Sequence, residues 1–123
     1  MEIRLPLKKK WFEMTKALIK TEDYREINEY WMKRLFDKSS FELYLESKYS
    51  GGNEFENCTF HIDFALFKNF DHNIMTLGYP SYNNTDRILI FEHKGIEIRT
   101  GNTDWGAEPN KLYFVIKHGK LLN

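Results

Sequence analysis

Apolar and polar residues alternate in several segments of this chain, a pattern typical of half-buried β-strands. The alternation predicts a first strand at 3–7, where Pro6 indicates a sheet edge or a bend. It is most regular at 60–66, where every second residue is a large apolar one. Further strands are predicted at 21–27, at 87–91, at 96–99 after a turn or bulge at Lys94-Gly95, and at 112–117.

Apolar residues at spacings of three and four predict two helices near the start of the chain. The first spans 9–19, with Trp11, Met14 or Thr15, and Leu18 on one face, and Trp11 is expected in the core. The second follows the N-cap residue Asn28, includes Trp31 as a further expected core residue, and ends near 37–40. The pattern at 41–45 fits a strand or a short helix. We predict a turn at 50–53, a long polar loop at 71–86 and a further loop at 100–110.

Five or six short strands with two early helices indicate an α+β fold, organised as a small, partly open β-barrel. The length of 123 residues predicts a single domain over 1–123. A hydrophobic fraction of 41% suffices for one core, and aromatic residues at 16% would fill much of it.

Charge and cysteine content narrow the classes of function. The formal net charge is zero, so nucleic-acid binding would have to depend on a local basic patch, such as the early cluster that includes Lys8, Lys9 and Lys10. Cys58 is the only cysteine, which excludes an intrachain disulfide and a cysteine metal site. The sequence shows neither a signal peptide nor a membrane-spanning apolar run, so we expect a cytoplasmic protein without membrane association.

The segment from Lys20 to Arg25 carries the densest candidate chemistry. On a strand, Asp23 and Arg25 share one face while Glu22 and Tyr24 share the other, and Lys20 at the corner can turn toward either. Lys20 and Arg25 would bind a phosphate or a polarised carbonyl, with Asp23 holding one cation or handling a proton. A solvated edge strand or a structural ion pair across the barrel mouth would explain the same residues.

Two further positions are candidates. Trp105, in the loop Trp105–Pro109, could stack on a base while Glu108 accepts hydrogen bonds, although the same tryptophan could instead plug the barrel end. Glu92 could face a cleft of the barrel as a second carboxylate. His61 and Asp63 share a strand face but have no third ligand at metal spacing, so we expect no metal and no cofactor.

The stretch from Leu18 to Arg25 resembles the signature of the ASCH domain family, Gly-x-Lys-x-x-Glu-x-Arg, with Lys20 and Arg25 matching. Asp23 stands for the glutamate and Leu18 for the glycine. The flanking Trp11–Met14 and the late Trp105–Pro109 also resemble small phage and bacterial members, so the similarity covers the first 36 and roughly the last 30 residues.

The resemblance implies a PUA-like β-barrel and an RNA- or nucleoside-binding module, whose partner would be RNA or a modified nucleoside held between Lys20–Arg25 and the Trp105 loop. The expected catalytic residues are Lys20, Asp23 and Glu92, and the expected substrate-binding residues are Thr21, Tyr24, Arg25, Trp105 and Glu108.

Two other functions remain open at this point. One is an enzyme, either an amidohydrolase that deacylates N4-acylcytidine or a ribonuclease. In the amidohydrolase branch a lysine, a threonine and a glutamate carry the reaction, and here Asp23 stands at the threonine position. The other is a phage or host protein-interaction module.

Overall fold

The computed structural model describes residues 1–49, 61–81 and 83–123, which divide into two units. The first unit combines Met1–Glu26 with Asn69–Asn123, and the second is the intervening Ile27–Lys68. A single domain over 1–123 stays a prediction.

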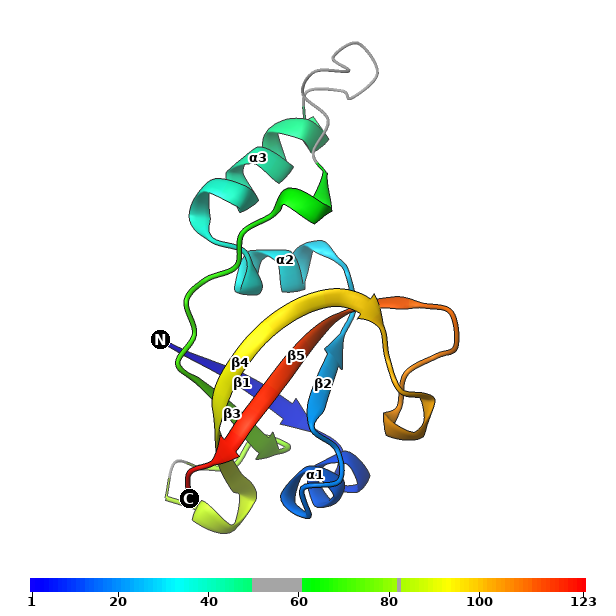
Figure 1. Ribbon diagram of the computed structural model, residues 1–123. Coiled ribbons are helices and arrows are strands. Elements are labelled where there is room, and N and C mark those ends of the chain that lie inside the picture. The colour runs from blue at the N-terminus through cyan, green and yellow to red at the C-terminus, as the bar shows by residue number, and fades with distance from the viewer. Residues whose placement is uncertain (50–60, 82) are drawn as a thin grey trace. The chain divides into compact units, whose positions relative to one another are not determined.

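The first unit is built on one five-stranded mixed sheet with the order β1-β3-β4-β5-β2 (Figure 1). Its strands are β1 (Glu2–Leu7), β2 (Glu22–Arg25), β3 (His72–Leu77), β4 (Ile88–Thr100) and β5 (Leu112–Leu121). β1 pairs in parallel with β3, and the other neighbours pair antiparallel. β4 is long and strongly curved, so the sheet forms a half-barrel (Figure 1). The prediction of a small α+β, barrel-like fold is confirmed at this level.

Several strands follow their predicted patterns. Ile3, Leu5 and Leu7 are buried in β1, which lies at a sheet edge as Pro6 indicates. The two predicted strands at 87–91 and 96–99 are one strand, β4, with register shifts against β5 between them. Gly95 has a φ of 111° in this irregular stretch, which corresponds to the predicted turn or bulge.

The segment 71–86 was predicted to be a loop, and that prediction is wrong for His72–Leu77, which forms β3. Its four central residues, Asn73 to Thr76, are all buried, so polar and apolar side chains both face inward. A strand buried on both faces loses the alternation that marks a half-buried one. The polar Asn73 and Thr76 are satisfied there by hydrogen bonds.

The first helix, α1 (Lys9–Lys16), ends earlier than predicted because the chain turns into a Schellman cap. The Leu18 amide donates to Thr15 O (3.1 Å) and the Ile19 amide to Met14 O (3.0 Å). Leu18 has a φ of 63° and is 59% exposed. The predicted place of Leu18 on the buried helix face is therefore wrong. Thr15, one of the two alternatives predicted for that face, is buried there together with Phe12, which was not predicted.

Replacing Leu18 by glycine is expected to stabilise the protein by about 0.5–1 kcal/mol, because a left-handed φ strains a residue with a Cβ. The exposed leucine side chain contributes little packing that would be lost. The measurement is the free energy of unfolding in urea. The control is Ala17→Gly, at a neighbouring exposed position with a φ of −76°, which should lower stability. Equal effects of the two changes would contradict the strain argument.

The second unit contains two α-helices, α2 (Glu29–Leu35) and α3 (Lys38–Tyr49). Asn28 caps α2 as predicted, since its side chain accepts from the Trp31 amide at 3.0 Å. Asp37 was placed at the end of the second helix, but it begins the third by accepting from the Ser40 amide at 2.8 Å. The described residues thus contain three α-helices rather than the predicted two, and 41–45 is helical.

The strand predicted at 60–66 is wrong for the described residues 61–66. Ile62–Phe64 forms a short 3₁₀ helix, in which Phe64 is 81% exposed. The Leu66 amide donates to the Ser40 hydroxyl, and the Leu66 carbonyl accepts from the Asp37 amide. Both backbone groups are therefore occupied outside a β-sheet. Phe60, the turn at 50–53 and Cys58 lie outside the described residues.

Candidate functional site

A cavity of about 340 Å³ opens in the first unit between the two edge strands of the sheet. Its walls are the end of β1, Trp11 of α1, the strand β2, and the segment that leads from the 3₁₀ helix η4 (Thr103–Trp105) into β5. Segments from both ends of the chain therefore form one cavity.

Lys20 is buried at this cavity, with 3% of its surface exposed. The Schellman turn ends α1 just before it and directs the chain into β2. Its Nζ donates to Glu22 O at 2.6 Å, lies 3.5 Å from Asp23 Oδ1, and sits 5.3 Å from the centre of the Tyr24 ring. Burial lowers the pKa of Lys20 more than the neighbouring Asp23 carboxylate raises it.

Asp23 is equally buried and holds two cations. Arg25 Nε donates to Asp23 Oδ2 at 2.5 Å, and its second nitrogen reaches Pro6 O at 2.9 Å. Burial alone would raise the pKa of Asp23, but Arg25 and Lys20 together outweigh burial and hold that pKa below its ordinary value. The predicted pairing of Asp23 with Arg25 on one face of the strand is confirmed.

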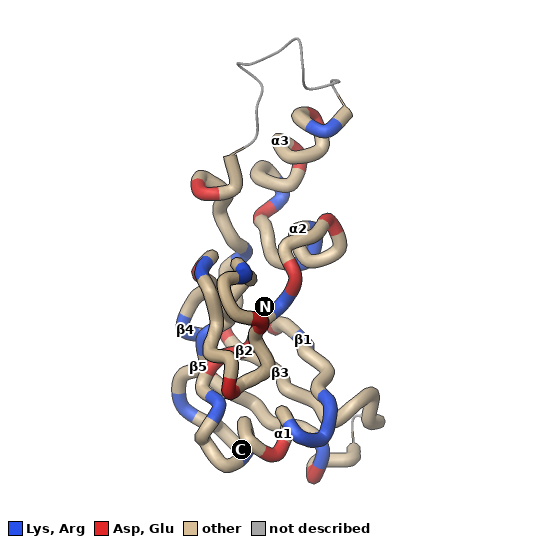
Figure 2. Tube along the Cα trace, turned by 90° about the vertical axis from the view of Figure 1, so that its right-hand side faces the viewer, with Lys and Arg blue, Asp and Glu red and all other residues tan. Residues whose placement is uncertain are grey.

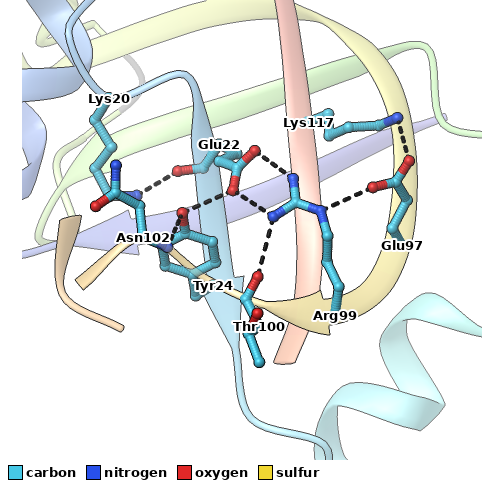
Figure 3. Close-up of polar contacts among 8 residues, drawn as sticks. All are labelled: Lys20, Glu22, Tyr24, Glu97, Arg99, Thr100, Asn102 and Lys117. Atoms are coloured by element: carbon cyan, nitrogen blue, oxygen red, sulfur yellow. Dashed lines mark hydrogen bonds and ion pairs between the residues drawn. The ribbon is translucent and has the colours of Figure 1, made fainter. Parts of the chain in front are cut away.

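The hydroxyl of Tyr24 is fixed on the other face of β2 (Figure 3). It donates to Glu22 Oε2 at 2.7 Å and accepts from the Asn102 amide at 2.9 Å. Burial and the Glu22 carboxylate raise the pKa of Tyr24, so the phenol stays protonated. The ring, which lines the cavity, is therefore held in a single orientation.

Ion pairs extend this contact across three strands (Figure 3). Arg99 of β4 makes a two-point contact to Glu22 of β2, with distances of 2.9 and 2.6 Å. Arg99 also donates to Glu97, which in turn accepts from Lys117 of β5 at 2.8 Å. The short edge strand β2 is thereby tied to β4 across β5.

Two glycines allow aromatic rings to form walls of the cavity. A Cβ at Gly106 would lie 2.8 Å from the Trp11 ring, and Gly106 has a φ of 97° that favours glycine. A Cβ at Gly101 would lie 2.8 Å from the Tyr24 ring. Trp11 was expected in the core, but it is half-buried and faces the cavity beside Trp105, which is also half-buried. Trp31, also expected in the core, is half-buried in α2.

The cavity brings together most of the residues that the sequence singled out, namely Lys20, Asp23, Tyr24, Arg25, Trp105 and Glu108. Thr21 is exposed and lines a second cavity of about 320 Å³, which Lys20 also borders. Glu92 lines neither cavity and lies 3.4 Å from Lys94. Glu108 pairs with Lys111 at 3.2 Å.

Other residues that line the cavity were not predicted as site residues, among them Pro6, Leu7, Lys8, Glu26 and Tyr113. Nothing in the sequence distinguishes Tyr113 from the other residues of the strand β5. Lys8 belongs to the early basic cluster, and that cluster is the sequence feature from which this part of the cavity wall could have been predicted.

A buried polar group spans the three inner strands of the same sheet. Asn73 of β3 is fully buried, and its Nδ2 donates to Lys117 O at 3.1 Å and to His118 Nδ1 at 2.8 Å. A carbonyl can only accept, so this contact fixes the amide, and Asn73 Oδ1 then accepts from His93 Nδ1 at 2.7 Å. His118 must therefore be neutral. Burial lowers the pKa of His118 to about 4.

Within 1–49, 61–81 and 83–123, no three or more histidine, cysteine or acidic side chains cluster as metal ligands would. None of the helices in this part combines the length and the apolar character needed to cross a bilayer.

The fold and the site together define a small α+β protein with a half-barrel sheet and a cavity walled by aromatic rings around a buried Lys-Asp-Arg group. Comparisons of the chain with protein-family models, curated proteins and solved structures find no match.

Proposed function

We propose that this chain is an RNA- or nucleoside-binding module of the ASCH type with a PUA-like fold, and that the cavity between β1 and β2 holds a nucleobase. The observation that carries the proposal is the convergence of Lys20, Asp23 and Arg25 with Trp105 on one cavity. These residues come from two stretches about 80 positions apart in the sequence, and the fold brings them to one cavity.

The backbone at Leu18 supports the ASCH alignment independently of the cavity. The family signature has glycine at this position, and Leu18 adopts a φ of 63°, a conformation that glycine adopts without strain. The turn at Leu18 thus has the backbone conformation that the glycine of the signature would favour.

The chemistry of the walls suits a base. Aromatic rings such as Trp11 and Trp105 offer faces for stacking, worth ~1–3 kcal/mol per base. The Lys20, Asp23 and Arg25 group offers polar side chains in which both cations are already paired with a carboxylate, which suits the polar edge of a neutral base.

Wild-type protein is expected to bind nucleosides or a short single-stranded RNA, and Trp105→Ala to weaken that binding roughly 5- to 100-fold, as loss of one stacking ring would. Fluorescence anisotropy with labelled RNA and calorimetry with nucleosides measure both. The control is Tyr79→Ala, which removes an aromatic side chain that is 92% exposed and does not line the cavity. No binding by the wild-type protein at low salt would remove the proposal.

A second candidate, an amidohydrolase that deacylates N4-acylcytidine, is favoured by one specific observation. Lys20 is buried at the cavity, and burial lowers its pKa, which is the direction that proton transfer by a lysine requires. Glu92 would not serve as its partner from its place on β4, whereas Glu26 and Glu108 are carboxylates that line the cavity. Chromatography of N4-acetylcytidine recovered from the calorimetry cell distinguishes turnover from binding, and an intact acyl group leaves the module as a binder.

A further inference from the structure

The charges inside the cavity wall are matched within the protein. Lys20 and Arg25 both contact the buried carboxylate of Asp23. Glu26 and Glu108 both contact Lys111, at 2.8 and 3.2 Å. A ligand phosphate at Lys20 or Arg25 would have to compete with Asp23, which is 2% exposed and cannot move into water. These two cations therefore suit a neutral group better than an anion.

Two more cations lie at the cavity wall or next to it, and among the described residues neither has an acidic partner. Lys8 lines the cavity, and Lys10 Nζ lies 4.8 Å from the centre of the Trp11 ring, which also lines it. Both side chains are exposed, and in the part of the chain that the structure describes neither forms an ion pair. Figure 2 shows this basic run where β1 leads into α1. The unbalanced positive charge of the site is thus at Lys8 and Lys10.

We infer that Lys8 and Lys10 form a phosphate-binding subsite, and that the ligand of the cavity is a phosphate-bearing nucleotide unit whose base enters between Trp11 and Trp105. The inference rests on the proposed function and adds the position of the phosphate. It differs from the expectation drawn from the sequence, in which Lys20 and Arg25 contact the phosphate. Lys10 Nζ lies 4.8 Å from the centre of the Trp11 ring, which forms a wall of the cavity, so a base that contacts this wall would bring its adjoining phosphate near Lys10.

The experiment compares three ligand types with wild-type protein and with a Lys8→Gln/Lys10→Gln variant. The probes are the four ribonucleosides, their 5′-monophosphates and a short mixed-sequence single-stranded RNA, each at several salt concentrations. The variant should bind the phosphate-bearing ligand roughly tenfold more weakly at low salt and should lose about 1.4 from the slope of log K against log salt, ~0.7 for each contact. Its affinity for the uncharged nucleosides should stay within about twofold of wild type.

The control variant is Lys16→Gln/Lys120→Gln, which removes the same charge from two exposed lysines that do not line this cavity. It should retain the wild-type slope. A gain in affinity from nucleoside to monophosphate would assign the subsite to a terminal phosphate, and a gain with RNA alone to a phosphodiester.

The inference is overturned if Lys8→Gln/Lys10→Gln leaves the slope unchanged, or if the control variant lowers it equally. Tight nucleoside binding with either of these results would leave the proposed function standing. Absence of binding to every probe would overturn the proposed function together with the subsite.

Discussion

Replacing Asp23 by asparagine is expected to destabilise the protein by about 3–5 kcal/mol, the largest effect of any single substitution considered for this chain. Asp23 is 2% exposed and is the carboxylate that both Lys20 and Arg25 contact. Asparagine keeps the shape but leaves two cations without a counter-charge in a buried site. The measurement is the free energy of unfolding from urea titration at pH 7.5.

Glu97→Gln is the matched control for this prediction. Glu97 also contacts two cations, Arg99 and Lys117, but its side chain is 48% exposed. Because water screens exposed ion pairs, we expect a loss of at most about 1 kcal/mol. If the two variants lose the same free energy of unfolding, burial does not make the Asp23 ion pairs more important for stability than the exposed pairs of Glu97.

The same argument changes what Asp23→Thr would do. Judged by the motif, threonine would restore the residue type of the ASCH amidohydrolase branch. In the structure, however, a threonine hydroxyl cannot neutralise Lys20 and Arg25 as the carboxylate does. The pKa of Lys20 would also fall further, because Asp23 is the main group that raises it against burial. We therefore expect the Asp23→Thr variant to be less stable than the wild-type protein, and any gain of activity would occur in this less stable variant.

Lowering the pH from 7.5 to 5 is expected to destabilise the protein by about 2 kcal/mol through His118. The pKa of His118 is about 4 in the folded protein, below the ordinary value of 6.5 for the unfolded chain. The unfolded state therefore binds the proton first, and stability is lost as the pH falls through 6.5 toward 4. Burial is the main cause; Asp23 opposes it, while Lys20 and His93 add to it.

His118→Asn tests this pH dependence. An amide oxygen can accept from Asn73 Nδ2 as His118 Nδ1 does, but it does not titrate in this range. The variant loses the stacking of the imidazole on Phe91, so its stability at pH 7.5 should be lower. The informative quantity is the slope between pH 7.5 and 5, which should be much flatter than in wild type. His93, whose pKa burial also lowers, accounts for a residual slope of the same sign. A slope equal to that of wild type would contradict the assignment to His118.

Part of the site could be predicted from the sequence because strand geometry is local. Alternation across β2 was enough to pair Asp23 with Arg25 and to separate them from Tyr24. The side of the strand taken by Lys20 depends on the turn after α1, which in turn depends on the left-handed φ of Leu18. A leucine at this position gives no indication of a left-handed φ.

The failures in the fold have a shared physical reason, since the hydrophobic pattern describes one side chain at a time and not its neighbours. Residues 61–66 alternate well, yet Ile62–Phe64 forms a 3₁₀ helix that pairs with no strand of the described residues, and Phe64 is exposed. β3 alternates poorly, yet its position between β1 and β4 buries both of its faces. Buried Asn73 became acceptable only because Lys117, His93 and His118 satisfy its amide.

The contact between Arg25 and Pro6 has a consequence for solubility. β1 and β2 are the two edges of the half-barrel, and open sheet edges invite pairing with other chains and aggregation. Pro6 removes a donor from one edge, and the Arg25 guanidinium of the other edge occupies the Pro6 carbonyl. The Arg25 side chain thus covers an acceptor at the open edge of β1 while forming part of the cavity wall. Loss of Arg25 would free this acceptor, so aggregation of such a variant would reflect a more exposed edge of β1 as well as a damaged site.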